Sequence, residues 1–217
     1  VTPNRSDCFS IMGIAREISV LLKKDFNDSK LHRNISYLEV DQNTKDYSIS
    51  IENSELCSRY LGYIVDGIEV EESPYWLKRK LNAAGLKSIN NVVDVTNYVM
   101  LEIGQPLHAF DSNSIKNRKI IIRTAKTGEL IETLDDESQK LQDDMLVIAD
   151  STKPIAIAGV IGGKDTAITD STKSIIFESA TFSQQSIRKT SSALRIRTEA
   201  SSRFEKGINP DLAKIAI

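Results

Sequence analysis

Residues 91–111, with the sequence NVVDVTNYVMLEIGQPLHAFD, bring several side chains capable of chemistry close together along the chain. Thr96, Asn97, Pro106 and His108 flank a glycine-proline break, where helix propensity falls and the chain must turn. The break presents His108 on a loop or at the start of a strand. A histidine side chain titrates near neutral pH and can position or deprotonate a water molecule. A lone histidine is more often structural, so this segment by itself leaves both interpretations open.

Residues 155–183 form a second unusual segment, which is rich in glycine at its start. Gly159, Gly162 and Gly163 permit close backbone approach or a positive φ, so that amide N–H groups can point at an anion or a carbonyl group. The segment is not a P-loop, because the Lys-Ser/Thr ending is absent. It also lacks the βαβ unit that surrounds a dinucleotide fingerprint.

Glu178 follows the apolar run 175–177 in the same segment. By strand alternation it shares a face with Ile176, where an unpaired carboxylate would be costly. Such a residue needs a partner, and we expect either an internal arginine or a hydroxyl group of a ligand. The alternative is an outward-facing strand residue, which the pattern alone does not exclude.

The composition of the 217 residues is that of a folded globular chain, with 40% hydrophobic and 27% charged residues. The formal net charge is −2, so no overall basic field points to a nucleic-acid partner. No apolar run approaches the roughly 20 residues of a membrane span, and we expect no membrane association. Two cysteines and two histidines predict neither a disulfide framework nor a zinc site, and no metal site is expected. A cytoplasmic location fits this cysteine usage best.

Charge is unevenly distributed along the chain. Residues 129–145 carry seven acidic residues and one lysine, whereas residues 187–206 carry six basic and two acidic residues. The acidic cluster lacks the ligand order of a calcium loop and is better explained by a hairpin turn. The basic segment either contacts phosphates or is a solvated helix face.

The pattern of elements predicts an α+β fold, with a β-rich core that is barrel-like or a meandering antiparallel sheet and is flanked by helices. Helix signals cover 10–22, a segment from Ser73-Pro74 to Gly85, 88–98 and 183–194, and a further helix opens at 209–210. Ser73 and Ser88 are the expected caps of the second and third of these helices, and Leu77 and Leu81 are expected to face the core. Residues 57–70 predict a strand or a bent pair, broken at Gly62 and Gly67. Short β-prone runs lie at 120–122, 130–134, 145–148, 155–161 and 174–177. Residues 23–34 are polar and turn-rich. We expect one domain over 1–217, cut from a longer chain.

Six blocks of the sequence resemble, in order, the central B3/B4 editing region of the β subunit of bacterial phenylalanyl-tRNA synthetases; they are 2–17, 58–65, 90–111, 155–163, 177–183 and 197–210. Residues 23–56 and 112–150 carry little of this resemblance. Two departures are mild: Lys87 stands where arginine is expected, and Lys164 follows the glycine pair where an acid is common.

The resemblance implies hydrolytic proofreading, in which tyrosine mistakenly esterified to tRNA(Phe) is removed in a pocket separate from the synthetic site. It assigns His108, Asn97 and Thr96 to the catalytic part, near the scissile ester and the terminal adenosine. The substrate-binding part comprises Glu178, which recognises the tyrosine hydroxyl, together with Gly162, Pro106, Thr198 and Ala200. The terminal ribose hydroxyl of the tRNA is an alternative group for orienting the water.

The resemblance also implies partners and cofactors. The partners are the 3′ end of tRNA(Phe) carrying tyrosine and the α subunit of a heterotetrameric synthetase. ATP and Mg²⁺ would serve the parent synthetase, whereas this fragment would need no cofactor. Two further hypotheses are a non-catalytic tRNA-binding or scaffold module, and an independent ATP-dependent ligase. The second is disfavoured because no ATP motif is visible.

Overall fold

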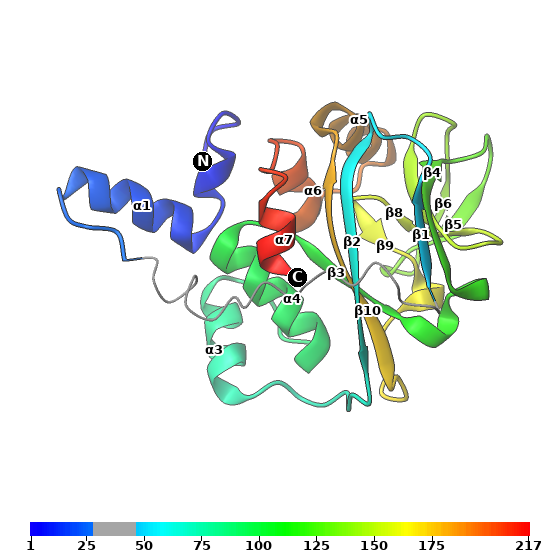
Figure 1. The fold of residues 1–217 in the computed structure, drawn as a ribbon, viewed down its shortest axis with the longest axis horizontal. Coiled ribbons are helices and arrows are strands. Elements are labelled where there is room, and N and C mark those ends of the chain that lie inside the picture. Colours follow the sequence, from blue (N-terminus) through cyan, green and yellow to red (C-terminus); the bar gives the residue numbers. More distant parts are fainter. Residues whose placement is uncertain (28–46) are drawn as a thin grey trace.

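The computed structural model describes residues 1–27 and 47–217, so part of the polar segment predicted at 23–34 lies outside the described residues. Within these limits the chain has a mixed α+β fold, as predicted. A three-stranded sheet runs through the centre, with α3, α4 and α7 on one side and a larger sheet on the other (Figure 1). The helices are α1 (Ile11–Leu21), α3 (Tyr75–Ala83), α4 (Asn91–Ile103), α5 (Gln184–Leu194), α6 (Glu199–Phe204) and α7 (Leu212–Ala216).

The central sheet has the order β2-β10-β3 and is antiparallel throughout. Its strands are β2 (Cys57–Asp66), β10 (Ser174–Phe182) and β3 (Leu107–Asp111). The predicted break at Gly62 does not occur, and β2 ends before Gly67, whose φ is +70°. In this sheet Glu178 pairs with Gly62 on one side and with His108 on the other. Residues that pair across strands share a face, so the register places Glu178 and His108 on the same side of the sheet.

The larger sheet has the order β1-β4-β7-β8-β9, and a separate hairpin joins β5 to β6. Its strands are β1 (Ser48–Ile51), β4 (Lys119–Thr124), β7 (Leu146–Ala149), β8 (Pro154–Ile157) and β9 (Ile161–Gly162); the hairpin comprises β5 (Leu130–Glu132) and β6 (Ser138–Lys140). Among the described strands the sheets do not close into a barrel, and β1 pairs with β4 in parallel. The barrel-like alternative is therefore wrong, because the β-rich part is divided between a mixed sheet, a small sheet and a hairpin.

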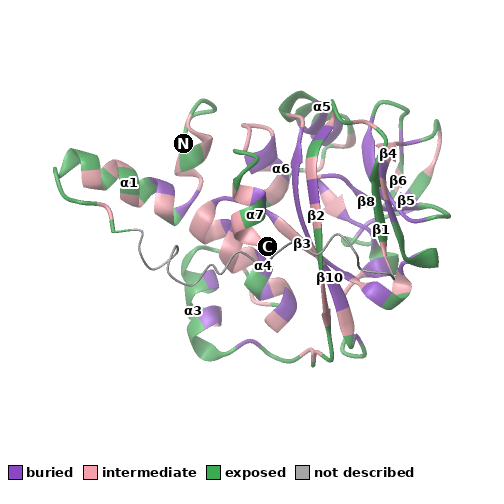
Figure 2. Cartoon of the chain, viewed as in Figure 1, coloured by how far each residue is buried: buried purple, intermediate pink, exposed green. Residues whose placement is uncertain are grey.

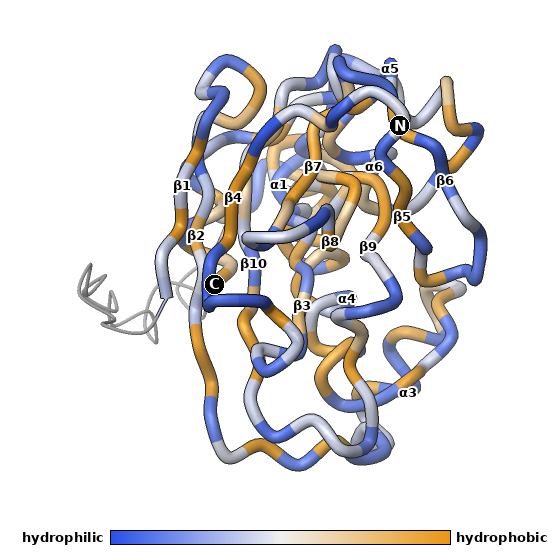
Figure 3. Tube along the Cα trace, turned by 90° about the vertical axis from the view of Figure 1, so that its right-hand side faces the viewer, coloured by the Kyte–Doolittle hydropathy of each residue, from blue (hydrophilic) through white to orange (hydrophobic). Residues whose placement is uncertain are grey.

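The core lies between the central sheet and the larger sheet. Every residue of β7 and β8 is buried, and these strands are largely hydrophobic along their length (Figures 2 and 3). Burial on both faces explains why these strands appear in the sequence as continuous apolar runs rather than as alternating patterns. Two short strands were not predicted from the sequence, namely β1 and β6.

The helix predicted at 10–22 is present as α1, but its apolar side is not covered by described residues. Ile11, Ile14 and Ile18 remain 46–60% exposed, and α1 is mostly exposed in Figure 2. Ser10 caps the helix by accepting a hydrogen bond from the amide of Gly13, which is the buried residue of this helix. No helix in the described part of the chain is long and apolar enough to cross a membrane.

Two helix starts differ from the sequence prediction for one reason. The hydroxyls of Ser73 and Ser88, which were expected to cap helices, both donate to the buried carboxylate of Asp94. The helix α3 therefore starts after Pro74 without a side-chain cap, and Asn90 caps α4 by accepting from the amide of Val93. Gly104 ends α4 in a left-handed conformation, with φ of +91°.

Asp94 holds the turn before α4, because it also accepts from the amide of Ile89 at 2.8 Å. We predict that Asp94→Ala lowers the free energy of unfolding by about 3 kcal/mol, since three donors lose a buried charged acceptor. Urea unfolding measures this change, and Glu69→Ala, at an exposed carboxylate, serves as the control. Equal midpoints for the two variants would contradict the role of Asp94.

Candidate active site

A cavity of about 450 Å³ opens beside β3, between the central sheet, α4, β9 and α6. Its volume lies within the usual range for small-molecule sites. The lining includes all three residues assigned to catalysis by the resemblance, Thr96, Asn97 and His108. It also includes all five assigned to substrate binding, Pro106, Gly162, Glu178, Thr198 and Ala200. The structure thus brings together residues that span more than 100 positions of the sequence.

Glu178 is buried, with 6% of its surface exposed, and lines the cavity beside His108, its partner on the neighbouring strand. Its partner within the described chain is not an arginine, and the ligand hydroxyl, the other expected partner, stays a prediction. The hydroxyl of Tyr60 donates a hydrogen bond to Oε2 of Glu178 at 2.8 Å. Burial raises the pKa of Glu178 to about 8, and the hydrogen bond from Tyr60 acts in the opposite direction. A neighbouring hydroxyl donor therefore favours the ionised form of this carboxyl group.

His108 extends from β3 into the same cavity, with its ring packed edge-on against Phe110 at 4.5 Å between centroids. Its Nε2 is buried and has no hydrogen-bond partner among the described residues. Burial lowers the pKa of His108 to about 4, so the imidazole is neutral at physiological pH. A general base works best with a pKa near the working pH. Of the two roles considered from the sequence, this environment favours positioning a water molecule over deprotonating it.

Gly162 forms the wall that faces the imidazole. A Cβ at this position would lie 2.8 Å from His108 Nε2 and 2.9 Å from Leu134 Cδ1. The absence of a side chain therefore leaves room for His108. The carbonyl of Gly162 accepts a hydrogen bond from the amide of Leu134, which ties the β5–β6 hairpin to this wall. Lys164 stands where the related family commonly has an acid, and it strengthens the contact between the hairpin and the glycine segment. It forms ion pairs with Glu132 at 2.9 Å and with Asp136 at 2.6 Å.

The remaining predicted residues complete the lining. Thr198 caps α6 and its hydroxyl donates to the carbonyl of Val160 at 2.8 Å, which joins this helix to the glycine segment. Thr96 is buried, and its hydroxyl donates to the carbonyl of Val93 at 2.7 Å. Asn97 makes no side-chain hydrogen bond with a described residue. Its side-chain amide is therefore more available to a ligand than the hydroxyl of Thr96.

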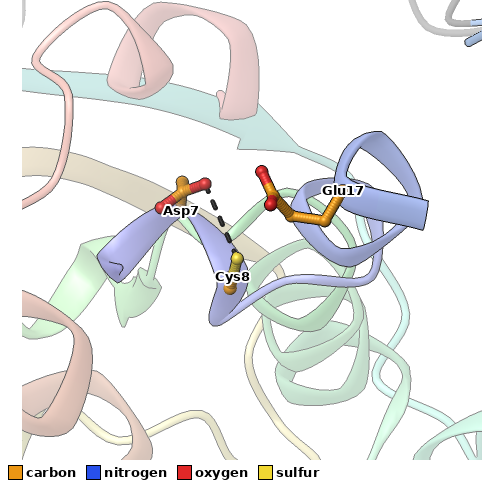
Figure 4. A group of neighbouring side chains, drawn as sticks. All are labelled: Asp7, Cys8 and Glu17. Carbon is orange, nitrogen blue, oxygen red and sulfur yellow. Dashed lines mark hydrogen bonds between the residues drawn. The ribbon is translucent and has the colours of Figure 1, made fainter. Parts of the chain in front are cut away.

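Ion pairs partly neutralise the acidic segment 129–145 and the basic segment 187–206, both between the two segments and within the basic one. Lys189 pairs with Asp144, and Arg203 pairs with Glu199 at 2.7 Å. Asp7, Cys8 and Glu17 lie close enough together to suggest a cation site (Figure 4). The guanidinium of Arg5 already binds this group, with contacts of 2.8 Å to Asp7 and 2.5 Å to Glu17.

Comparison with known proteins assigns a family to this arrangement. A family model described as "B3/4 domain" matches residues 56–217, which is about three quarters of the chain and includes every residue of the predicted site. The chain belongs to the B3/4 domain family. The B3/4 match begins just before β2 and ends with α7, so it contains both larger sheets except β1.

Curated relatives of this B3/4 chain carry the name phenylalanine–tRNA ligase β subunit. The relative from Carboxydothermus hydrogenoformans is 46% identical over 217 residues, covering 100% of the chain and 27% of the relative. One from Dehalococcoides mccartyi strain CBDB1 is 48% identical over 217 residues, covering 100% and 26%. The chain thus spans about a quarter of the length of these relatives.

A solved structure shares the B3/4 fold. An N-terminal fragment of the phenylalanyl-tRNA synthetase β subunit from Pyrococcus horikoshii aligns with a TM-score of 0.50 and 17% identity. The alignment covers 91% of this chain and 59% of that one. At this identity the similarity concerns the fold, and it agrees with the α+β architecture described above.

The buried acid of this B3/4 chain predicts a pH-dependent stability. The Glu178 carboxyl releases its proton near pH 4.5 when the chain is unfolded and, with a pKa of about 8, near pH 8 when it is folded. Between these values the folded state binds more protons, so the free energy of unfolding falls as the pH rises. Below about pH 6.5 the buried neutral His108 has the opposite effect, because the unfolded chain then binds a proton that the folded chain does not.

We therefore compare the free energy of unfolding between pH 6.5 and 8, where the proton binding of Glu178 has a larger effect than that of His108. The parent chain should lose roughly 1 kcal/mol per pH unit, and Glu178→Gln should remove this loss. Urea unfolding at several pH values gives both slopes, with Glu69→Gln, at an exposed carboxylate, as the matched control. A Glu178→Gln slope equal to that of the parent would show that the carboxyl is already ionised in the folded chain.

Proposed function

We propose that the cavity is a proofreading site that hydrolyses tyrosine esterified to the 3′ end of tRNA(Phe). One observation carries this proposal: a buried carboxyl group, Glu178, lies in a cavity of amino-acid size, next to a histidine on the neighbouring strand that has an unpartnered nitrogen. The name of the relatives, phenylalanine–tRNA ligase β subunit, supports the choice of tRNA.

Recognition of the added hydroxyl follows from the physics of buried polar groups. A hydrophobic pocket rejects an analogue that only adds a hydroxyl by about 10²-fold, so a phenylalanine-binding site also admits tyrosine. A second site that must bond the hydroxyl works in the opposite sense. Phenylalanine in this cavity would cover Glu178 and leave its free oxygen without a partner, at a cost of about 1–3 kcal/mol or more. Sites that read a hydroxyl in this way can discriminate by a factor on the order of 10⁴.

The hydrolysis itself needs a positioned water and stabilisation of the developing oxyanion. The water oxygen bonds to the ester carbonyl carbon, the bond from that carbon to the ribose oxygen breaks, and the ribose hydroxyl receives a proton. Free tyrosine and the intact tRNA are released. The neutral His108 accepts a hydrogen bond from the water, Asn97 contacts the ester or the adenosine, and the amide of Gly162 is the candidate oxyanion donor. The ribose hydroxyl of the tRNA next to the ester is a second candidate for orienting the water.

The wider assignment belongs to the same proposal. The chain would act within a phenylalanine–tRNA ligase, together with a tRNA and an α subunit that binds ATP and Mg²⁺ for synthesis. A scaffold that binds tRNA without hydrolysis is the second candidate. The intact cavity, with its buried acid, favours the hydrolase. Binding of tRNA by a scaffold does not require an unpartnered imidazole nitrogen beside a buried carboxyl group.

The experiment that tests the proposal measures ester hydrolysis by the assembled synthetase containing this chain. Tyrosyl-tRNA(Phe) and phenylalanyl-tRNA(Phe) are supplied separately, and the release of each amino acid is followed. We expect the tyrosyl ester to be hydrolysed at least about 10²-fold faster than the phenylalanyl ester. Binding of both tRNAs without release of tyrosine would favour the scaffold and reject the hydrolase.

A further inference from the structure

The chain itself supplies a phenol to the carboxyl group that is proposed to read a phenol. Tyr60, on β2, is 7% exposed and is packed in the main core cluster with Phe110 and Ile176. Its hydroxyl reaches Oε2 of Glu178 at 2.8 Å. Tyr60 does not belong to the cavity lining, whereas Glu178 does. The carboxyl group is therefore held from the core side and faces the cavity with its other side.

The strand register explains how Tyr60 reaches this position. Tyr60 pairs with Ala180, and Gly62 is the residue directly opposite Glu178. Tyr60 and Glu178 are thus diagonal neighbours on one face of the sheet, a separation that an aromatic side chain can bridge. A Cβ at position 62 would lie 2.9 Å from Ile49 Cδ1 and 3.5 Å from Ile176 Cγ2, and it would meet neither Tyr60 nor Glu178 within 4 Å.

We propose that Tyr60 is a positioning residue that sets specificity: its hydroxyl fixes Oε2 of Glu178 and reserves the second carboxylate oxygen for the hydroxyl of the bound amino acid. This inference rests on the proposed function of the cavity. A carboxyl group that already has one hydrogen bond keeps a single orientation, so the ligand hydroxyl meets a preorganised acceptor. Without Tyr60 the carboxyl group can rotate, and its two oxygens become equivalent.

The hydrogen bond also affects the charge of Glu178. Burial raises its pKa and the bond from Tyr60 lowers it, so removing the hydroxyl should raise the pKa further and reduce the ionised fraction at neutral pH. The other ionisable groups around Glu178 come from β2, β3 and α6; they are the thiol of Cys57, the imidazole of His108, and Glu199, which is paired with Arg203. None of these donates a hydrogen bond to the carboxyl group of Glu178 in the described structure.

The test uses Tyr60→Phe in the full-length subunit assembled with its partner subunit. This variant removes the hydroxyl and keeps the ring in the core. We expect KM for tyrosyl-tRNA(Phe) to rise about tenfold with kcat within about twofold, and KM for the phenylalanyl ester to stay unchanged. The inflection of kcat/KM against pH for the tyrosyl ester should move to higher pH. Tyr63→Phe, at a 40% exposed tyrosine of the same strand, is the matched control.

A double-mutant cycle separates positioning from packing. In a Glu178→Ala background, Tyr60→Phe should no longer change the ratio of the two KM values, because its partner is absent. An unchanged KM ratio and an unchanged pH inflection in Tyr60→Phe, with normal folding by urea unfolding, would overturn the inference. The same ratio change in both backgrounds would overturn it as well. Failure of the proposed function is distinguishable, because the parent protein would then show no preference for the tyrosyl ester.

Discussion

Glu178→Ala should reduce the preference for the tyrosyl over the phenylalanyl ester by on the order of 10²-fold, the largest change in selectivity that we expect from one substitution. The variant removes the acceptor for the hydroxyl and also the group that phenylalanine would leave unpaired in the cavity. Leaving a buried hydrogen-bonding group unpaired costs about 1–3 kcal/mol, and each 1.4 kcal/mol corresponds to a factor of ten. The measurement is kcat/KM for the two esters.

The direction of the change identifies the mechanism. Loss of recognition lowers kcat/KM for the tyrosyl ester and raises or preserves that for the phenylalanyl ester, whereas general damage lowers both. Glu69→Ala removes an exposed carboxylate from the loop after β2 and should leave both values unchanged. An unaltered ratio in Glu178→Ala would refute the assigned role of this carboxyl group.

Gly162→Ala should lower kcat for tyrosyl ester hydrolysis by on the order of 10²-fold while the fold persists. The added methyl group would lie 2.5 Å from Cε1 of His108, far inside normal contact distance. The imidazole is the end of a rotatable side chain, so it relieves the overlap by moving away. A displacement of about 1 Å at a positioned group can cost 10²-fold in rate, and the overpacking costs about 1–3 kcal/mol in stability.

Two other glycines supply the comparison for this prediction. At Gly85 an added Cβ would meet nothing within 4 Å, but the φ of this residue is +82°. Gly85→Ala should therefore lower the stability through backbone strain and leave kcat unchanged. At Gly163 a Cβ would lie 2.5 Å from the carbonyl oxygen of Ile155, a backbone atom that cannot rotate away, so Gly163→Ala should impair folding. Wild-type kcat in Gly162→Ala would mean that the position of His108 does not limit hydrolysis.

Much of the site follows from local patterns together with the family resemblance. Strand alternation predicts that Glu178 shares the buried face of Ile176, and both are buried. The glycine-proline break predicts His108 on a loop or at a strand start, and the strand alternative is confirmed, because β3 begins at Leu107. Periodicity predicts the burial of Leu77 and Leu81 in α3. These features depend on residues that are near each other in the chain.

Other features depend on long-range contacts, which no local pattern contains. Tyr60 and Glu178 are 118 positions apart, and their contact follows from the register between β2 and β10. The predicted caps fail because Asp94, itself far from Ser73 in the sequence, binds both serine hydroxyls. The division of the β-rich part into separate sheets depends on strand pairing, including the parallel pairing of β1 with β4.

The central claim is that Glu178 binds the hydroxyl of tyrosine inside the cavity. A crystal structure with bound tyrosine, or with a non-hydrolysable tyrosyl adenosine ester analogue, tests it most directly. The account predicts a phenol oxygen within about 2.5–3.2 Å of the carboxylate oxygen that Tyr60 leaves free, and an amino-acid carbonyl directed toward His108 and Gly162. A tyrosine ring bound outside the cavity, or a phenol oxygen with no contact to Glu178, would contradict it.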